Sequence, residues 1–365
     1  MNNDEILFSI ITVCYNSEST IRRTIESVVK QTYSYREYII VDGASSDKTL
    51  DIIREYRKKY SWIKYISEPD QGIYDAMNKG IALTEGEFVG IINADDWYEI
   101  DALMTVNDYI CKSQEDVDIV CGRINIWRDE KTKSVSTIRS TNMLWEGMVF
   151  SHPAIFVRRE LYMKYGGYDK NFKIAADYKF FFERYLDGER FCVIDKVIAD
   201  FCYGGISTTE NYLTACETNS VVLSYLNMCE NPERIKEICN RRLRSGFLWD
   251  EILLHPDEVG AELRSMLCAG KDLVVFGTGF WSELINRIVD DTDRIICYVD
   301  NDRSKWGKKY YNKYIHNPQR LVNGSYNVII ASFDYEAEIR NQIIGLNNES
   351  INLITLNDVI ECLLE

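Results

Sequence analysis

The chain has 365 residues, of which 46% are hydrophobic and 27% charged, and its formal net charge is −15. This length is comfortable for two domains, and five prolines without a low-complexity tract argue against long disordered segments. The acidic balance excludes a protein that coats nucleic acid, and no apolar run approaches the ~20 residues that span a bilayer.

The first hundred residues alternate apolar runs with segments whose apolar residues recur at helical spacing. This pattern predicts strands over 6–13, 38–41, 62–66 and 88–92. It predicts helices over 18–31, from a cap at 45–47 to about 59, and over 72–83. Strands joined by helical crossovers form a mostly parallel sheet, and ligands bind beyond the carboxyl ends of such strands.

The pattern changes beyond residue 100. We expect a helix over 100–112 that leads to residues 118–124, a hairpin-like stretch around 129–131 and a helix that starts near Asp177. Mainly helical sequence follows, with Pro232 as a first helical residue and Pro256 as a boundary; strands over 271–277, 294–299 and 326–331 then indicate a small α/β unit. The predicted domains are 1–208, a helical extension or linker over 209–268, and 269–365.

Polar residues stand at the predicted strand ends. Asp95 and Asp96 directly follow the fourth strand, and a turn with a helix cap explains only one of them. A divalent cation with oxygen ligands beside a diphosphate explains both. The other strand ends carry Tyr15-Asn16, Asp42 and Asp70. The segment from Asp42 is either a turn with a helix cap or a contact to a nucleobase or ribose.

Four segments carry a resemblance to a known family: SIITVCYN at 9–16, EYIIVDGASSDKT at 37–49, EPDQGIYDAMNKGIA at 68–82 and NADD at 93–96. In order and spacing they resemble the family 2 glycosyltransferases, over about residues 6–205. The resemblance implies an α/β GT-A fold, the nucleotide-diphospho-sugar transferase fold with a mostly parallel sheet flanked by helices. A helical linker and a small Rossmann-like α/β domain would follow.

The resemblance also implies roles for the matching positions. Asp95 would bind Mn²⁺ or Mg²⁺ beside the diphosphate, with Asp96 in support or on the sugar. Asn93 stands where the family often has aspartate, so the charge of the metal site depends more on Asp95. The implied nucleotide-sugar contacts are Thr12, Tyr15, Asn16, Asp42, Gly72, Asn78, Lys79, Asn93, Ala94 and Asp96.

Enzymes of this family that invert the anomeric centre need a general base on the acceptor hydroxyl. The segment KIAADYKF at 173–180 resembles the acidic catalytic motif of the family, so Asp177 is the expected base. The alternative role for Asp177 is a helix N-cap, and Asp169 is the second choice of base. His152 is read equally as a structural residue and as an acceptor contact or metal neighbour.

The last predicted unit contains a strand followed by the turn Gly277-Thr278-Gly279-Phe280-Trp281-Ser282. Asp300 comes 23 residues after Gly277, near the spacing of an acid that binds ribose. Gly277, Gly279 and Asp300 are therefore candidates for nucleotide or nucleotide-sugar binding. A degenerate domain with a structural or interaction role is the alternative.

The expected function is metal-dependent, inverting transfer of a sugar from a nucleotide-diphosphate sugar, with uridine favoured over guanosine or thymidine. The acceptor would be a glycan or lipid-linked sugar in bacterial surface polysaccharide synthesis. Eleven cysteines without paired spacing and no signal peptide indicate a cytoplasmic protein, compatible with peripheral contact at the inner face of the cell membrane. The oligomeric state stays open.

Two alternatives to sugar transfer remain. One is a non-catalytic nucleotide-sugar-binding protein, against which an intact Asp95 and Asp177 argue. The other is an enzyme that forms sugar nucleotides; such enzymes usually have a glycine-rich, basic loop after the first strand, which residues 14–18 lack.

Overall fold

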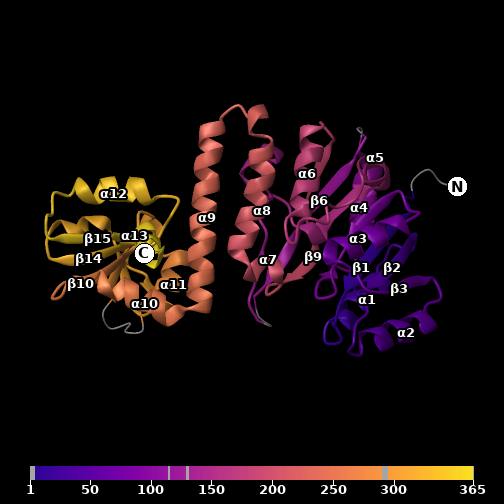
Figure 1. Ribbon diagram of the computed structural model, residues 1–365, viewed down its shortest axis with the longest axis horizontal. Coiled ribbons are helices and arrows are strands. Elements are labelled where there is room, and N and C mark those ends of the chain that lie inside the picture. The colour runs from indigo at the N-terminus through magenta and orange to yellow at the C-terminus, as the bar shows by residue number, and fades with distance from the viewer. Residues whose placement is uncertain (1–4, 114–115, 129–130, 290–294, 365) are drawn as a thin grey trace. The chain divides into compact units, whose positions relative to one another are not determined.

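A computed structural model describes residues 5–113, 116–128, 131–289 and 295–364 (Figure 1). The chain divides into two compact units: unit 1 is Met1–Thr209 with Cys216–Lys236, and unit 2 is Glu210–Ala215 with Glu237–Glu365. The predicted helical segment 209–268 is therefore shared between them. The predicted turn around 129–131 falls largely on residues 129–130, which lie outside the described residues.

Unit 1 is built on a nine-stranded sheet in the order β3-β2-β1-β4-β8-β6-β9-β5, with β7 paired to β6. Its strands are β1 Phe8–Cys14, β2 Arg36–Asp42, β3 Ile63–Ser67, β4 Phe88–Ile91, β5 Trp97–Tyr98, β6 Ile119–Trp127, β7 Lys133–Val135, β8 Ile155–Arg158 and β9 Phe191–Cys202. The first four are mutually parallel, as the strand–helix alternation predicts. Antiparallel pairing begins at β8.

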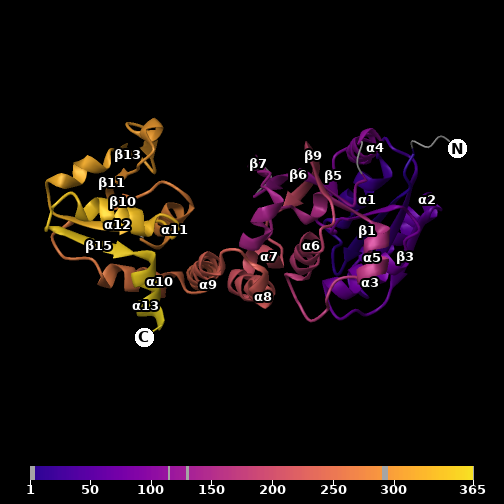
Figure 2. The same cartoon turned by 90° about the horizontal axis from the view of Figure 1, so that it is seen from above.

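Helices cover both faces of this sheet (Figure 2). They are α1 Ile21–Val29, α2 Thr49–Lys59, α3 Ile73–Ala82, α4 Ala102–Lys112, α5 Arg159–Tyr165, α6 Ala176–Leu186, α7 Ile206–Thr209 and α8 Asn211–Ser224, with 3₁₀ turns at Thr141–Glu146, His152–Ala154 and Leu226–Met228. Alternate side chains of a strand face opposite sides. Phe8 and Ile10 accordingly join one core with α1, α2 and α4, while Ile11 faces α3.

Helix α3 packs closely on β1 and β2. A Cβ atom at Gly80 would lie 2.6 Å from Ile11 Cγ2 and 3.3 Å from Val41 Cγ2, closer than ordinary side-chain contacts. Glycine at this position therefore lets the helix backbone approach the sheet. The close packing fixes the position of α3 on the sheet. Tyr74 and Asn78, both on α3, contact residues that follow β8 in the sequence.

Unit 2 contains a six-stranded sheet in the order β12-β13-β11-β10-β14-β15, parallel except for the β12–β13 pair. Its strands are β10 Asp272–Phe276, β11 Ile295–Val299, β12 Lys309–Tyr310, β13 Lys313–His316, β14 Tyr326–Ile330 and β15 Ile351–Thr355. Its helices are α9 Pro232–Leu254, whose first turn belongs to unit 1, α10 Pro256–Ser265, α11 Phe280–Ile288, α12 Glu336–Ile344 and α13 Leu356–Leu364, with 3₁₀ turns at Arg303–Lys305 and Pro318–Val322. Helices α9 and α10 begin at the two predicted prolines.

The parallel strands of unit 2 follow a doubly wound order, in which the chain reverses its direction of progress between β10 and β14. The unit is thus a second α/β sheet domain, as predicted. All eleven cysteines of the chain are free thiols. No helix in the described part of the chain combines the length and the apolar composition needed to span a bilayer.

Candidate active site

The carboxyl ends of four parallel strands meet at one edge of the unit 1 sheet. Strand β1 ends at Cys14, β2 at Asp42, β3 at Ser67 and β4 at Ile91. The register pairs Cys14 with Asp42, and Asp42 with Ser67. The polar segments that the sequence places after these strands therefore gather at this edge, where ligands of parallel sheets bind.

The loop that carries Asp95 and Asp96 is held by residues of two other segments, α1 and β9. Arg23 Nη2 donates a hydrogen bond of 2.8 Å to the Asp95 carbonyl oxygen, and Thr24 Oγ1 donates one of 2.6 Å to the Asp96 carbonyl oxygen. The backbone N–H of Cys202, at the end of β9, donates to Asp96 Oδ1 at 3.0 Å. These contacts fix the loop, and none of them uses the Asp95 carboxylate.

The electrostatics of this loop favour a cation. Burial raises the pKa of the Asp95 carboxyl, and burial together with the Asp95 charge raises the pKa of Asp96 well above its usual range. Asp96 Oδ2 and Asn93 Oδ1 are buried without a hydrogen-bond partner in the described residues. Two carboxylates with unused oxygen atoms suit Mg²⁺ or Mn²⁺, which commonly takes one or two protein carboxylates and completes its shell with water and phosphate.

No cluster of three or more His, Cys, Asp or Glu side chains is arranged for a metal within the described ranges. Ala94, the small residue between the polar positions, is 5% exposed and packs in the core beneath the loop.

Three predicted nucleoside contacts are engaged within the protein. Asp42 has no exposed surface; its carboxylate accepts from Ser45 Oγ, from the Ser45 N–H and from Ser67 Oγ, the last at 2.6 Å. Thr12 is also fully buried, and its Oγ1 accepts from the Tyr38 hydroxyl at 2.9 Å. Asn16 Oδ1 accepts from the Ser46 N–H at 2.9 Å. These side chains organise the loops at the edge of the sheet.

Tyr15, Gly43 and Asp70 lie together beside these loops. The Tyr15 side chain is 64% exposed. A Cβ atom at Gly43 would lie 2.5 Å from Asp70 Oδ2 and 3.4 Å from the Tyr15 ring, so the absence of a side chain there makes room for both groups. Asp70 Oδ1 accepts from the Gly72 N–H at 3.0 Å. An exposed aromatic face thus lies beside a carboxylate oxygen, an arrangement that suits a planar base with a ring N–H donor.

The predicted contacts on α3 bind other parts of the protein. The Asn78 side chain donates to the Tyr168 carbonyl oxygen and accepts from the Tyr168 N–H, both at 2.8 Å. Lys79 Nζ lies 3.0 Å from a Glu68 carboxylate oxygen and donates to the Pro69 carbonyl oxygen at 2.8 Å. Gly72 precedes α3 with φ 112°, a conformation that favours glycine.

Asp177 lies in the first turn of α6 and is half-buried. The N-cap of this helix is Ala175, so the alternative role of Asp177 as an N-cap is not met. Asp177 Oδ1 accepts from the Tyr178 N–H at 2.8 Å and from the Tyr74 hydroxyl at 3.0 Å. Among the described residues nothing donates to Oδ2, so this oxygen is available to a hydroxyl of a substrate.

The two other catalytic candidates, Asp169 and His152, also contact side chains of the protein. Asp169 Oδ2 accepts from Lys179 Nζ at 2.6 Å, and this bond holds the pKa of Asp169 below its usual range. An acid with a lowered pKa is a weaker base. His152 Nε2 lies 3.3 Å from the Tyr168 hydroxyl, and burial lowers the pKa of the imidazole although Asp177 opposes this.

In unit 2 the structure brings the three predicted residues together. Gly277 (φ 108°) ends β10 and Gly279 precedes α11, while Thr278 Oγ1 between them donates to Asp300 Oδ2 at 2.6 Å. Lys305 Nζ donates to the same oxygen at 3.0 Å. Burial by itself would raise the pKa of Asp300, but these hydrogen bonds outweigh it and the pKa is lowered.

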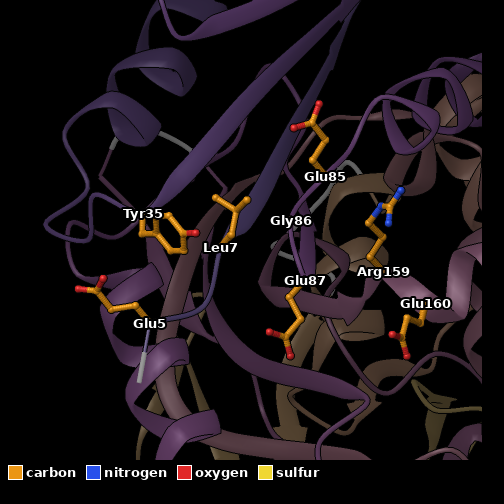
Figure 3. A pocket seen from close by; sticks show the side chains of 8 residues that line it. All are labelled: Glu5, Leu7, Tyr35, Glu85, Gly86, Glu87, Arg159 and Glu160. Atoms are coloured by element: carbon orange, nitrogen blue, oxygen red, sulfur yellow. The ribbon is translucent and has the colours of Figure 1, made fainter. Parts of the chain in front are cut away.

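A cavity of about 300 Å³ lies elsewhere in unit 1 (Figure 3). Its lining includes Leu7, which precedes β1, and Gly86 and Glu87, which precede β4. These residues lie at the amino ends of the strands, whereas Asp95 follows a carboxyl end. The cavity is therefore at the opposite edge of the sheet from the candidate active site.

Sequence reasoning missed several residues that shape the site. Arg23, Thr24 and Cys202 hold the Asp95–Asp96 loop from α1 and β9, and contacts between segments so far apart leave no local pattern. Gly43 lies inside a recognised motif, but its proximity to Asp70 requires the folded structure. Asp70 is among the polar strand ends that the sequence indicates, but no contact is predicted for it.

Comparison with known families places two matches on the chain. The model of "Glycosyl transferase family 2" matches residues 9–175, and the model "C2185-like, N-terminal" matches residues 270–352. A PGL/p-HBAD biosynthesis glycosyltransferase of Mycobacterium tuberculosis is 33% identical over 186 residues, which cover 48% of this chain and 68% of that protein. The uncharacterized glycosyltransferase EpsJ of Bacillus subtilis is 26% identical over 204 residues, 52% of this chain and 59% of that protein.

Two solved structures share the fold. TarS 1–349 of S. aureus has a TM-score of 0.52 at 19% identity, covering 72% of this chain and 80% of that chain; it has also been solved with UDP and with UDP-GlcNAc. The mannosyltransferase PcManGT of Pyrobaculum calidifontis, in complex with GDP-Man and Mn²⁺, has a TM-score of 0.51 at 17% identity and covers 71% and 78%. At these identities the likeness extends to the fold alone.

Proposed function

Because the chain belongs to glycosyl transferase family 2, we propose that it transfers a sugar, with inversion, from a nucleotide-diphosphate sugar to a hydroxyl group. The observation that carries this proposal is the Asp95–Asp96 loop. It lies at the carboxyl edge of the sheet, is fixed by Arg23 and by the Cys202 N–H, and leaves Asp96 Oδ2 without a hydrogen-bond partner in the described residues. A donor diphosphate bound through a cation matches this arrangement.

In the proposed reaction Asp177 is the general base. Its Oδ2 takes the proton of the acceptor hydroxyl while the hydroxyl oxygen attacks the anomeric carbon from the face opposite the diphosphate. The bond from the anomeric carbon to the diphosphate oxygen breaks, and the nucleoside diphosphate leaves with the bonding electron pair. Tyr74 holds the other carboxylate oxygen and thereby orients Asp177. Asp169, paired with Lys179, is the second choice for this role.

The residues that would hold a divalent cation are Asp95 and, in support, Asp96. Bound there, Mn²⁺ or Mg²⁺ would stabilise the negative charge of the departing diphosphate. In this proposal Asn93, whose amide oxygen has no hydrogen-bond partner among the described residues, would accept from a sugar or ribose hydroxyl. The PcManGT complex with Mn²⁺ is consistent with this assignment.

For the donor base we propose uracil, stacked on Tyr15 with its ring N–H donated to Asp70 Oδ2. The proximity of the exposed Tyr15 ring and Asp70 Oδ2 at Gly43 supports this position, whereas Asp42 is buried and bonded to two serines. Stacking on an aromatic side chain contributes about 1–3 kcal/mol per base. The TarS complexes with UDP and UDP-GlcNAc agree with a uridine donor.

Replacement of Asp70 by alanine should abolish the preference for UDP over CDP. Uracil donates a ring N–H where cytosine has a bare nitrogen, so an acceptor carboxylate favours uracil. A hydrogen bond to a charged group contributes about 1.5–3 kcal/mol, so we expect UDP affinity to fall by about 10-fold or more with little change for CDP. Isothermal titration calorimetry measures both constants. An equal loss for both nucleotides would indicate a damaged loop and contradict recognition by Asp70.

The proposed activity is tested by incubating the protein with a panel of UDP-, GDP- and dTDP-sugars, with and without Mn²⁺. Release of the nucleoside diphosphate is measured, with water or an added glycan as acceptor. We expect release from a UDP-sugar only in the presence of the cation. The proposal fails if no donor is turned over and none binds.

The acceptor in this proposal is a glycan or a lipid-linked sugar of a bacterial surface polysaccharide, met at the cytoplasmic face of the membrane. The name of the mycobacterial relative, which refers to PGL/p-HBAD biosynthesis, is consistent with acceptors of this kind. For unit 2 we propose nucleotide or nucleotide-sugar binding at Gly277, Gly279 and Asp300. The doubly wound order of its strands supports this, since ligands bind at the reversal point of such sheets.

A further inference from the structure

The backbone just before Asp177, residues 173–175, is held by a side chain that lies outside the region matched by the family model. Glu217, on α8, accepts hydrogen bonds from three consecutive backbone N–H groups: Lys173 at 2.8 Å, Ile174 at 2.8 Å and Ala175 at 2.9 Å. The first goes to Oε1 and the other two to Oε2. The family model ends at residue 175, 42 residues before Glu217.

These three N–H groups have a physical need for an acceptor. Ile174 and Ala175 are buried, and buried N–H groups without a partner are costly. The N-cap residue of α6, Ala175, has no side chain that can cap the helix. A carboxylate at this end also interacts favourably with the positive end of the helix dipole. Glu217 therefore accepts hydrogen bonds from the N-terminal end of α6, as a capping side chain does, although it lies on a different helix.

The contact bears directly on the position of Asp177. Only Ala176 lies between the loop of residues 173–175 and Asp177. The Tyr74 hydroxyl contacts both the Ile174 carbonyl oxygen and Asp177 Oδ1. The loop is thus fixed on one side by α3 and on the other by α8. With Glu217 removed, the first turn of α6 keeps the Tyr74 contact but loses the acceptor for three N–H groups.

We infer that Glu217 is a positioning residue that sets the place of Asp177 in sugar transfer, so that a side chain of α8 acts on the proposed base. This inference rests on the proposed function of Asp177. In Glu217→Ala the base is free to shift, and a misplacement of about 1 Å can reduce a rate about 100-fold. Glu217→Gln keeps one acceptor oxygen and has an intermediate effect.

Two measurements test the inference on the full-length protein. In Glu217→Ala, kcat for nucleoside diphosphate release should fall by about 10- to 100-fold, while the donor KM and the Kd for UDP stay within about twofold. Hydrogen exchange of peptides covering residues 173–177 should be about 10-fold faster. The control Glu230→Ala, which removes the same charge from an exposed position of unit 1, should change neither quantity.

The outcomes separate the two proposals. If the wild-type protein turns over no donor, the proposed function fails, and the exchange measurement still decides whether Glu217 holds the loop. Unchanged exchange in Glu217→Ala overturns the contact itself. Faster exchange with unchanged kcat in an active enzyme overturns the positioning role. A parallel loss of UDP binding would show a general structural defect and would also overturn it.

Discussion

Asp177→Asn is expected to lower the rate of sugar transfer by about 10²- to 10⁴-fold, the usual contribution of a positioned general base. The amide cannot take a proton from the acceptor hydroxyl. It preserves the size of the side chain, and its oxygen atom can still accept from Tyr74 and Tyr178, which now bond to Oδ1. Single-turnover measurements of nucleoside diphosphate release would give the rate, and calorimetry would give the affinity for UDP, which should stay unchanged.

Asp169→Asn is the matched control for this experiment. Asp169 lies in the same region, but Lys179 Nζ donates to it at 2.6 Å and lowers its pKa. We expect Asp169→Asn to reduce the rate by less than Asp177→Asn. A large loss in Asp169→Asn together with full activity in Asp177→Asn would assign the base to Asp169.

The first hundred residues, with strands β1 to β4, are the part of the chain that the sequence predicts best. Its four parallel strands are short apolar runs that end in polar residues, and the intervening helices have regular apolar spacing, so local patterns were sufficient. Strand β9, over Phe191–Cys202, was not predicted, because exposed Asp195 and Lys196 interrupt its buried pattern. Yet β9 supplies the Cys202 N–H that orients Asp96 from 106 residues away.

The direction in which a side chain points was harder to foresee than its place at a strand end. Asp42 and Asp70 both follow strands, and a carboxylate suits a nucleobase at either position. Only the folded chain distinguishes them: Ser45 and Ser67 bond to Asp42, while Asp70 Oδ2 lies beside Gly43 and the Tyr15 ring. The same limit applies to Glu217, because its partners lie on a loop more than 40 residues away in the sequence.

In the proposed metal site, the negative charge available to a cation depends mainly on Asp95. Because Asn93 carries no charge and Asp96 is 1% exposed with one oxygen bonded to the Cys202 N–H, the half-buried Asp95 is the carboxylate best placed to meet a cation that arrives with the donor. Burial raises the pKa of the Asp95 carboxyl although the charge of Arg23 opposes this, so burial is unfavourable for the carboxylate. The donor and its cation would relieve this cost, which couples their binding.

Asp95→Asn is accordingly expected to reduce turnover by about 100- to 1000-fold, the range seen when one group that stabilises transition-state charge is removed. The variant should also need a higher Mn²⁺ concentration for half-maximal activity, because a neutral amide oxygen binds a hard cation more weakly than a carboxylate. Mn²⁺ titrations of nucleoside diphosphate release would measure both effects. The Asp95 backbone contact to Arg23 should persist, so the loop keeps its shape.

Asp101→Asn provides the control of equal charge change, since Asp101 is exposed and its side chain makes no capping hydrogen bond to α4. It should leave the Mn²⁺ requirement of the enzyme unchanged. UDP binding gives a second, independent test: Mn²⁺ should strengthen it in the wild-type protein and in Asp101→Asn but not in Asp95→Asn. If Mn²⁺ strengthens UDP binding equally in all three proteins, the cation does not bind at Asp95 and the metal assignment is wrong.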